Sequence, residues 1–157
     1  MNSETLTDAF SWIMQILEEE KTNYQIVGGM AAFLHGGSRP IHDIDMYIPA
    51  EKAERVYQRV REFISKPLKR YTEEGWDIEY FQLIYSDQKI EIGLSPGGKF
   101  LSGKTNEWVN QDIDFKNFDQ IKFADIVTHV MPKPVLISYK RLLDREVDRQ
   151  DVADLAD

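Results

Sequence analysis

The stretch that decides the fold consists of Ile26-Val27-Gly28-Gly29 and, after thirteen intervening residues, Asp43-Ile44-Asp45-Met46. Residues 24–27 have the apolar, β-branched character of a strand, and residues 30–36, MAAFLHG, are typical of a brief helix after a glycine turn. Apolar side chains alternate along residues 44–48, which predicts a second strand ended by a proline. The predicted local order is therefore strand, glycine turn, helix, strand.

An acidic pair begins this second strand. Alternation places Asp43 and Asp45 on one face while Ile44 points into the core. Two carboxylates about 4 Å apart repel by roughly 4 kcal/mol at an effective dielectric of 20, so proteins normally offset such a pair with a cation or a proton. Oxygen-only ligands suit Mg²⁺, which is commonly shared with substrate phosphates. The pair thus predicts a divalent metal site that acts on a nucleotide.

Glu91 is the best candidate for a third carboxylate. It lies in the run Lys89-Ile90-Glu91-Ile92-Gly93-Leu94, whose isoleucines and leucine would face inward and leave Glu91 facing outward beside Gly93. Glu79 competes for the role because it alternates in the neighbouring strand, but the apolar neighbours and Gly93 favour Glu91. In two-metal catalysis the ions lie roughly 3.5 to 4 Å apart, and Glu91 would bind one of them or act as a base.

The glycine pair and a nearby arginine indicate phosphate binding. Gly28 and Gly29 allow close backbone approach, and the N–H groups of the following helix favour phosphate oxygens. Arg39 could make a bidentate phosphate contact or hold a carboxylate in place. His35 and His42 could be acid–base groups or metal ligands, but two histidines without a third N or S ligand are a poor zinc set, and His35 is expected to cap its helix.

The rest of the chain predicts an α+β fold, with a mixed β-sheet backed by helices, in a single domain over residues 1–157. The basic cluster at residues 66–70 is interpreted as a solvated loop without a function. Residues 95–120, rich in Gly, Ser, Asn and Asp, are expected to form an irregular loop. The other predicted elements are helices at 6–20 and 50–64, strands at 77–85 and 89–94 joined by a hairpin at 86–88, strands at 121–123 and 126–130, and a C-terminal helical segment at 138–157 capped by Ser138.

Composition limits the classes of function. The chain has 157 residues, a net charge of −8 and no cysteine, so a long nucleic acid is not an expected partner and thiolate metal sites are excluded. No stretch approaches the roughly 20 apolar residues that span a bilayer. The N-terminus lacks the basic-then-apolar order of a secretory signal. These features predict a soluble, cytoplasmic protein that does not associate with a membrane.

The combined pattern resembles the signature of the DNA polymerase beta-like nucleotidyltransferase superfamily: two apolar residues, Gly-Gly, thirteen residues, then Asp-apolar-Asp-apolar. Gly28-Gly29-Met30-Ala31, His35-Gly36, Arg39 and Asp43-Ile44-Asp45 look like the minimal nucleotidyltransferases of the antitoxin and antibiotic-modifying types. The overlap covers most of the chain. The C-terminal residues are similar to a final strand-to-helix segment in which a lysine and an acidic pair recur: Pro134 to Ser138, Lys140, Arg145, Asp151 and Asp154.

The resemblance implies a set of site residues. Asp43 and Asp45 would bind two Mg²⁺ ions, or Mn²⁺ in their place, and Glu91 would supply the third carboxylate, where relatives usually have Asp. Gly28 and Gly29 would hold the triphosphate of a donor such as ATP. For Lys140, a phosphate contact and a simple ion pair with a surface acid remain open, just as Asp151 and Asp154 would either serve the site or solvate a terminal helix.

The predicted function is metal-dependent transfer of a nucleoside monophosphate from a nucleoside triphosphate to a protein or small-molecule acceptor. Antitoxin-type relatives modify a toxin partner, and antibiotic-resistance relatives modify a drug hydroxyl. The alternative is a catalytically inactive protein of the same fold that binds a partner or a nucleotide. A polymerase or tRNA-adding enzyme is discounted because the chain lacks further RNA-binding domains.

Overall fold

A mixed nine-stranded sheet forms the centre of residues 3–156, the part of the chain that the computed structural model describes. Its strand order is β7-β6-β4-β5-β2-β1-β9-β8, and β3 pairs with β4 beside this path. Two pairings are parallel, β1 with β9 and β2 with β5, and the others are antiparallel. The strands are β1 Gln25–Ile26, β2 Ile44–Pro49, β3 Ile64–Glu73, β4 Trp76–Tyr85, β5 Gln88–Ser95, β6 Gly98–Leu101, β7 Trp108–Gln111, β8 Asp119–Phe123 and β9 Ile126–Val130.

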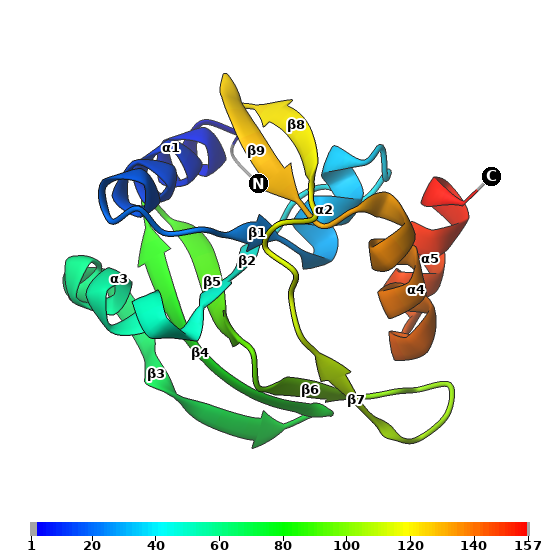
Figure 1. The fold of residues 1–157 in the computed structure, drawn as a ribbon. Helices are drawn as coiled ribbons and strands as arrows, with labels where there is room; N and C mark the ends of the chain where they lie inside the picture. Colours follow the sequence, from blue (N-terminus) through cyan, green and yellow to red (C-terminus); the bar gives the residue numbers. More distant parts are fainter. Residues whose placement is uncertain (1–2, 157) are drawn as a thin grey trace.

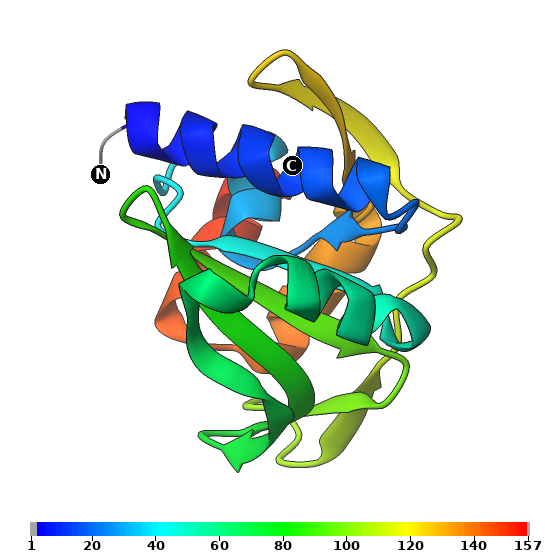
Figure 2. The same ribbon diagram turned by 90° about the vertical axis from the view of Figure 1, so that its left-hand side faces the viewer.

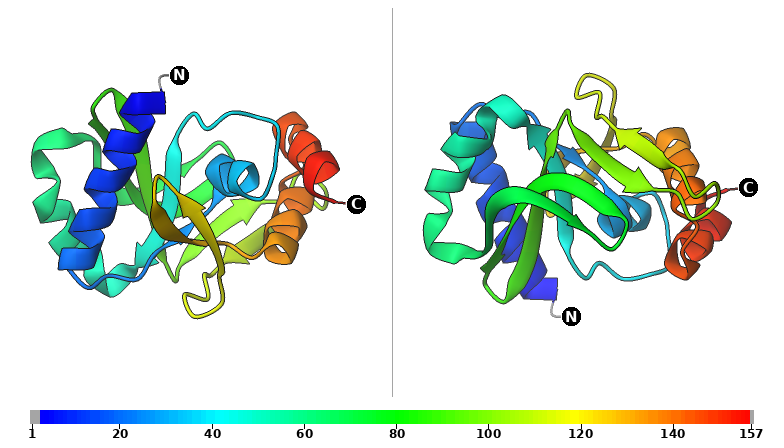
Figure 3. Two further views of the ribbon diagram at one scale, coloured as in Figure 1. Left: turned by 90° about the horizontal axis from the view of Figure 1, so that it is seen from above. Right: turned by 90° about the horizontal axis from the view of Figure 1, so that it is seen from below.

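Helices cover both faces of the sheet (Figure 1). The longest helix, α1, lies with α3 against one face, and the remaining three lie on the opposite side, as the perpendicular views show (Figures 2 and 3). No described helix is both long and apolar enough to cross a membrane. The helices are α1 Ser3–Glu19, α2 Gly28–Leu34, α3 Ala53–Arg59, α4 Lys133–Leu143 and α5 Glu146–Leu155, with 3₁₀ turns η1 Ala50–Lys52 and η2 Arg61–Phe63.

The two central strands explain why the sheet places acidic side chains on one face. In β2, Ile44, Met46 and Ile48 are at most 1% exposed and belong to the core, and Ile90 and Ile92 of β5 are fully buried beside them. The period of two then directs the intervening residues of both strands to the opposite face. The predicted α+β class and mixed sheet are confirmed. Of the predicted domain, residues 1–2 and 157 lie outside the described residues.

The structure corrects several predicted helix bounds. The apolar stripe at 50–64 does not form one helix, because α3 is flanked by two 3₁₀ turns and residue 64 already begins β3. The C-terminal segment does not start at Ser138. The helix α4 starts at Lys133 with a proline in its first turn, where a missing N–H costs no helical hydrogen bond. It ends at Leu143, its C-cap residue Asp144 has a left-handed φ of 53°, and α5 follows as a separate helix.

Two predicted loops also contain strands. The basic residues 66–70 lie within β3, which pairs along β4, so the interpretation as a solvated loop is wrong. The segment 95–120 contains the antiparallel pair of β6 and β7. The strands β3 and β7 lie at edges of the sheet, and their exposed residues lack the apolar alternation of the central strands. The hairpin between β4 and β5 is confirmed, with a two-residue turn in which Ser86 and Asp87 both have positive φ.

Candidate functional site

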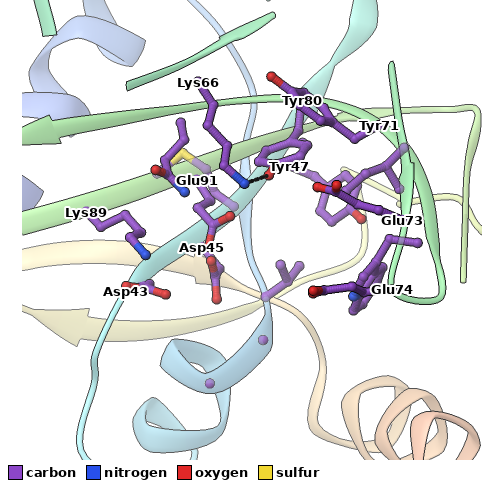
Figure 4. Close-up of a pocket in the computed structure, with 18 of the residues that line it drawn as sticks. Asp43, Asp45, Tyr47, Lys66, Tyr71, Glu73, Glu74, Tyr80, Lys89 and Glu91 are labelled. Atoms are coloured by element: carbon purple, nitrogen blue, oxygen red, sulfur yellow. Dashed lines mark hydrogen bonds between the residues drawn. The ribbon is translucent and has the colours of Figure 1, made fainter. Parts of the chain in front are cut away.

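A pocket of about 440 Å³ opens on the face of β2 and β5 that carries the acidic residues, a volume typical of small-molecule sites (Figure 4). The hairpin of β3 and β4 forms one wall, the start of α2 lies at its base, and α4 with the start of α5 closes another side. The lining residues are Val27, Gly28, Gly29, Asp43, Asp45, Met46, Tyr47, Lys66, Tyr71, Glu73, Glu74, Trp76, Ile78, Tyr80, Gln82, Lys89, Glu91, Gly93, Tyr139 and Arg145.

The three predicted carboxylates all line this pocket. Asp45 of β2 and Glu91 of β5 are register partners in the parallel pairing, so their side chains emerge on the same face at neighbouring positions. Asp43 lies just before β2, and Figure 4 shows it on the same side, with Lys89 pointing toward it. Glu79 lies on β4 outside the lining, 3.7 Å from the guanidinium of Arg70. The geometry therefore brings Glu91, and not Glu79, to the acidic pair.

The acidic residues repel one another in the absence of a cation. Burial raises the pKa of Asp45 well above its ordinary value, and the negative charges of Glu91 and Asp43 raise it further. Burial, followed by the charge of Asp43, likewise raises the pKa of Glu91. A site whose carboxylates resist ionisation in this way is suited to a cation, which would favour their charged forms.

The donor set fits Mg²⁺ in type, and its three carboxylates line one pocket. Among residues 3–156, no group of three His, Cys, Asp or Glu side chains is arranged so that it could hold a metal ion by itself. Mg²⁺ does not need such a cage, because it usually keeps several waters and takes one or two carboxylates together with substrate phosphates. Asp43, Asp45 and Glu91 offer only oxygen atoms at one pocket surface, which satisfies this requirement.

The glycine pair opens α2 directly below the acidic residues. Gly28 has a φ of +63°, and a Cβ atom there would lie 2.7 Å from Oδ2 of Asp45. A side chain at this position would therefore displace the carboxylate as well as strain the backbone. A Cβ on Gly93 would lie 2.9 Å from the ring of Tyr47, so this second glycine makes room for a ring that lines the pocket.

Arg39 and four charged residues of the C-terminal segment form what we call the C-terminal ion cluster. The four are Lys140, Arg145, Asp148 and Asp151. Arg39 donates to both carboxylate oxygens of Asp151, at 2.8 and 2.7 Å. The ammonium of Lys140, 2% exposed, lies 2.9 Å from Asp151 and 3.2 Å from Asp148. Arg145 makes a further pair of hydrogen bonds to Asp148.

This cluster bears on two predicted phosphate contacts. Arg39 has the second of its two predicted roles, since it holds a carboxylate, and its Nη2 lies 3.5 Å from where a Cβ on Gly29 would be. Lys140 is buried between two carboxylates and does not line the pocket, so the predicted ion pair is observed, with buried rather than surface acids. Asp154 accepts hydrogen bonds from Ser38 instead of joining the cluster.

Sequence reasoning missed several pocket residues on the β3–β4 hairpin and on α5. Lys66 donates from Nζ to the hydroxyl of Tyr80 at 3.2 Å, and both face the pocket beside Tyr71 (Figure 4). The sequence of β3 has no regular apolar alternation, so no local signal marked Lys66 as a strand residue. Of the histidines, His35 is the C-cap of α2, with Nε2 2.8 Å from the carbonyl oxygen of Met131, and His42 is exposed outside the pocket.

The fold of this chain is shared with solved nucleotidyltransferase structures. No family model matches the sequence, and no curated protein matches it significantly. A candidate nucleotidyltransferase of Thermotoga maritima superposes with a TM-score of 0.75 at 20% identity, over 98% of this chain and 93% of its own. The lincosamide antibiotic adenylyltransferase LnuA, solved with lincomycin, gives 0.63 at 17% identity, over 99% of this chain and 96% of its own.

A third similar structure is the antibiotic-resistance factor ANT(2'')-Ia, with a TM-score of 0.62 at 14% identity, over 97% of this chain and 81% of its own. At these identities the likeness concerns the arrangement of helices and strands and not the individual site residues. The chain therefore has the nucleotidyltransferase fold that its resemblance to the DNA polymerase beta-like superfamily predicted.

Proposed function

We propose that this protein is a metal-dependent nucleotidyltransferase that moves a nucleoside monophosphate from a nucleoside triphosphate to a small-molecule or protein acceptor. One observation carries the proposal: Asp43, Asp45 and Glu91 line a single pocket immediately beside the Gly28–Gly29 start of α2. The pKa values of Asp45 and Glu91 stay raised despite the lysines and arginine nearby, so a bound metal ion would favour the charged carboxylates, and backbone N–H groups beside them suit a phosphate. The shared fold of two antibiotic-modifying proteins supports the same conclusion.

The reaction would join an acceptor hydroxyl or amine to the α-phosphorus of the donor. The new bond forms between the acceptor atom and this phosphorus, the bond between the α-phosphorus and the bridging oxygen breaks, and pyrophosphate leaves. Glu91 would take the acceptor's proton if it does not bind a metal ion, and its raised pKa suits a proton acceptor. Asp43 and Asp45 would hold Mg²⁺, whose charge stabilises the attacking and leaving oxygens when it is bound.

Each end of the pocket suits one part of the substrates. Gly28 and Gly29 would receive the triphosphate, with Arg39 stabilising the turn through Asp151. The β3–β4 wall presents aromatic rings from Tyr71, Trp76 and Tyr80, which suit stacking on a flat ring of the donor or the acceptor. The structure of LnuA with lincomycin is a precedent for a small-molecule acceptor. A toxin is the candidate protein acceptor, because the sequence also resembles antitoxin-type nucleotidyltransferases.

The test is transfer from radiolabelled nucleoside triphosphates with Mg²⁺, over a panel of lincosamides, aminoglycosides and protein acceptors. We expect label on an acceptor and stoichiometric pyrophosphate from the wild type, and neither from an Asp43→Asn, Asp45→Asn double variant. Equal turnover by the double variant would exclude these residues as the metal site.

A second function is non-catalytic binding of a nucleotide or a partner. It is favoured by Lys89 and Lys66: burial raises the pKa of Glu91, but the charges of these lysines act to lower it and so offset part of the negative charge of the site without a metal ion. Mg²⁺-dependent triphosphate binding without pyrophosphate release across the acceptor panel would support this alternative.

A further inference from the structure

Arg145 is the member of the C-terminal ion cluster that reaches the pocket. It is the N-cap residue of α5, and its side chain is 52% exposed while its partner Asp148 is fully buried. Nε and Nη2 donate to the two oxygens of Asp148 at 2.6 and 3.1 Å, and the guanidinium carbon lies 5.9 Å from the ring centre of Trp76. The guanidinium is thus fixed between a buried carboxylate and an aromatic ring of the hairpin wall.

Hydrogen-bonding capacity remains on the exposed edge of this guanidinium. Arg145 has five N–H donors in a planar fork, and Asp148 engages Nε and one donor of Nη2. Within residues 3–156, no acceptor is observed for Nη1 of this residue. A fixed guanidinium with unused donors facing a pocket is a ready partner for a phosphate, which it can bind in a bidentate manner.

The net charge of the C-terminal ion cluster also favours the binding of an anion such as a phosphate. Three cations share two carboxylates, so the C-terminal ion cluster retains one positive charge, and Lys140 and Arg39 are already bonded to Asp151. Arg145 is close enough to Asp45 for each charge to influence the other. Arg145 also lines the same pocket as Asp45 and Gly28, where the triphosphate is proposed to bind.

We propose that Arg145 is a triphosphate-binding residue of this site and that Asp148 and Lys140 are positioning residues that hold its guanidinium toward the pocket. The inference rests on the proposed function and assigns to Arg145 the phosphate contact that the sequence pattern suggested for Lys140. Lys140 would act indirectly, without touching the triphosphate. Its ammonium neutralises Asp148 and allows that carboxylate to remain buried.

The test compares nucleotide affinities by isothermal titration calorimetry with Mg²⁺ present. ATP, GTP, CTP and UTP are titrated first, and the best ligand is then compared with its monophosphate. Arg145→Gln should weaken triphosphate binding by about 10- to 100-fold, the value of a hydrogen bond to a charged group, and monophosphate binding by less than about threefold. Arg145→Lys keeps the charge but loses the fork, and its affinity should fall between those of the wild type and Arg145→Gln.

Arg149→Gln is the matched control, because Arg149 belongs to the same helix, pairs with Asp144 and does not line the pocket. It should bind the triphosphate as the wild type does. Equal triphosphate affinity in Arg145→Gln, or equal losses for the triphosphate and the monophosphate, would overturn the inference and leave the proposed function standing. If the wild type binds none of the four triphosphates, the proposed function fails together with the inference. Should Arg145→Gln fail to melt cooperatively, Arg145→Lys decides by the same comparison.

Discussion

Asp45 and Glu91 are direct partners across the parallel pairing of β2 and β5, so their carboxylates project from adjacent strands at the same level. This pairing predicts that Glu91→Gln lowers the rate of nucleotide transfer by at least about 100-fold, the lower range for loss of an acid–base group. Glu79→Gln is the control, because Glu79 lies on β4 outside the pocket. Single-turnover assays at saturating Mg²⁺ compare the transfer rates of the two variants. A larger loss of rate in Glu79→Gln than in Glu91→Gln would assign the role of third carboxylate to Glu79.

The raised pKa of Asp45 predicts a stability effect that is separate from catalysis. Because the folded-state pKa lies above the ordinary value of 3.8, the favourable contribution of this carboxyl is complete below that value and is lost as the pH rises through the folded-state pKa. Asp45→Asn should therefore raise the melting temperature at pH 7 in EDTA. The gain should disappear near pH 3 and shrink when millimolar Mg²⁺ is added. Thermal unfolding at several pH values measures this, and a lower melting temperature for Asp45→Asn at pH 7 would contradict it.

Substitution of the first glycine of α2 should damage the site. Gly28→Ala places a Cβ atom 2.7 Å from Oδ2 of Asp45 and imposes a φ of +63° on a residue with a side chain, at a cost of about 1 to 3 kcal/mol. We expect a lower melting temperature and loss of Mg²⁺-dependent nucleotide binding. Gly36→Ala serves as the control, since Gly36 also has positive φ but a Cβ atom there would meet nothing within 4 Å. It should lose stability yet retain nucleotide binding.

The ion pairs that the buried Asp151 makes with the half-buried Arg39 and the buried Lys140 should contribute to stability in a pH-dependent manner. Burial raises the pKa of Asp151, but hydrogen bonds from Arg39 and Lys140 outweigh it, so the pKa lies below 3.8. A lowered folded-state pKa stabilises the fold above 3.8, and this contribution is lost as the pH falls through the lowered value. Asp151→Asn should cost about 3 kcal/mol at pH 7, as expected when a buried ion pair loses one partner.

Urea unfolding of the wild type and Asp151→Asn at pH 7 and at pH 3 checks this prediction, and the difference in unfolding free energy should narrow at the lower pH. Asp154→Asn is a suitable control on the same helix, because Asp154 bonds to Ser38 at the exposed surface. A difference that widens at pH 3 would contradict the assignment of the stabilising charge to Asp151.

The central strands and the acidic site were predictable because their signals are local. Alternation in β2, continued to the residue before it, is enough to place Asp43 and Asp45 on one face, and a period of two in β5 does the same for Glu91. The role of Lys140 was not predictable in the same way, because its two carboxylate partners come from α5 and their position depends on how α5 packs against α4.

The positions of Lys66 and Arg145 in the pocket were not predicted, because both depend on tertiary packing. Lys66 belongs to a ribbon that is exposed on much of its surface, so its sequence lacks the apolar pattern that marks a buried strand. Arg145 occupies a helix start where a small polar residue is the usual cap, and its direction depends on Asp148 and Trp76. Tertiary packing, and not local preference, brings these cations to the pocket.

The wall of the pocket opposite the acidic residues includes a peripheral strand, β3, that can vary separately from the strands carrying those residues. The acidic residues belong to the interior strands β2 and β5, whereas much of the opposing wall comes from a ribbon whose outer strand, β3, pairs only with β4. Insertions, deletions or exchanges of side chains in β3 can reshape the wall while β4 keeps its pairing with β5 and β5 keeps its pairing with β2. Under the proposed transfer reaction, natural variation or directed evolution of β3 would therefore change which acceptor binds while Asp45 and Glu91 stay in place.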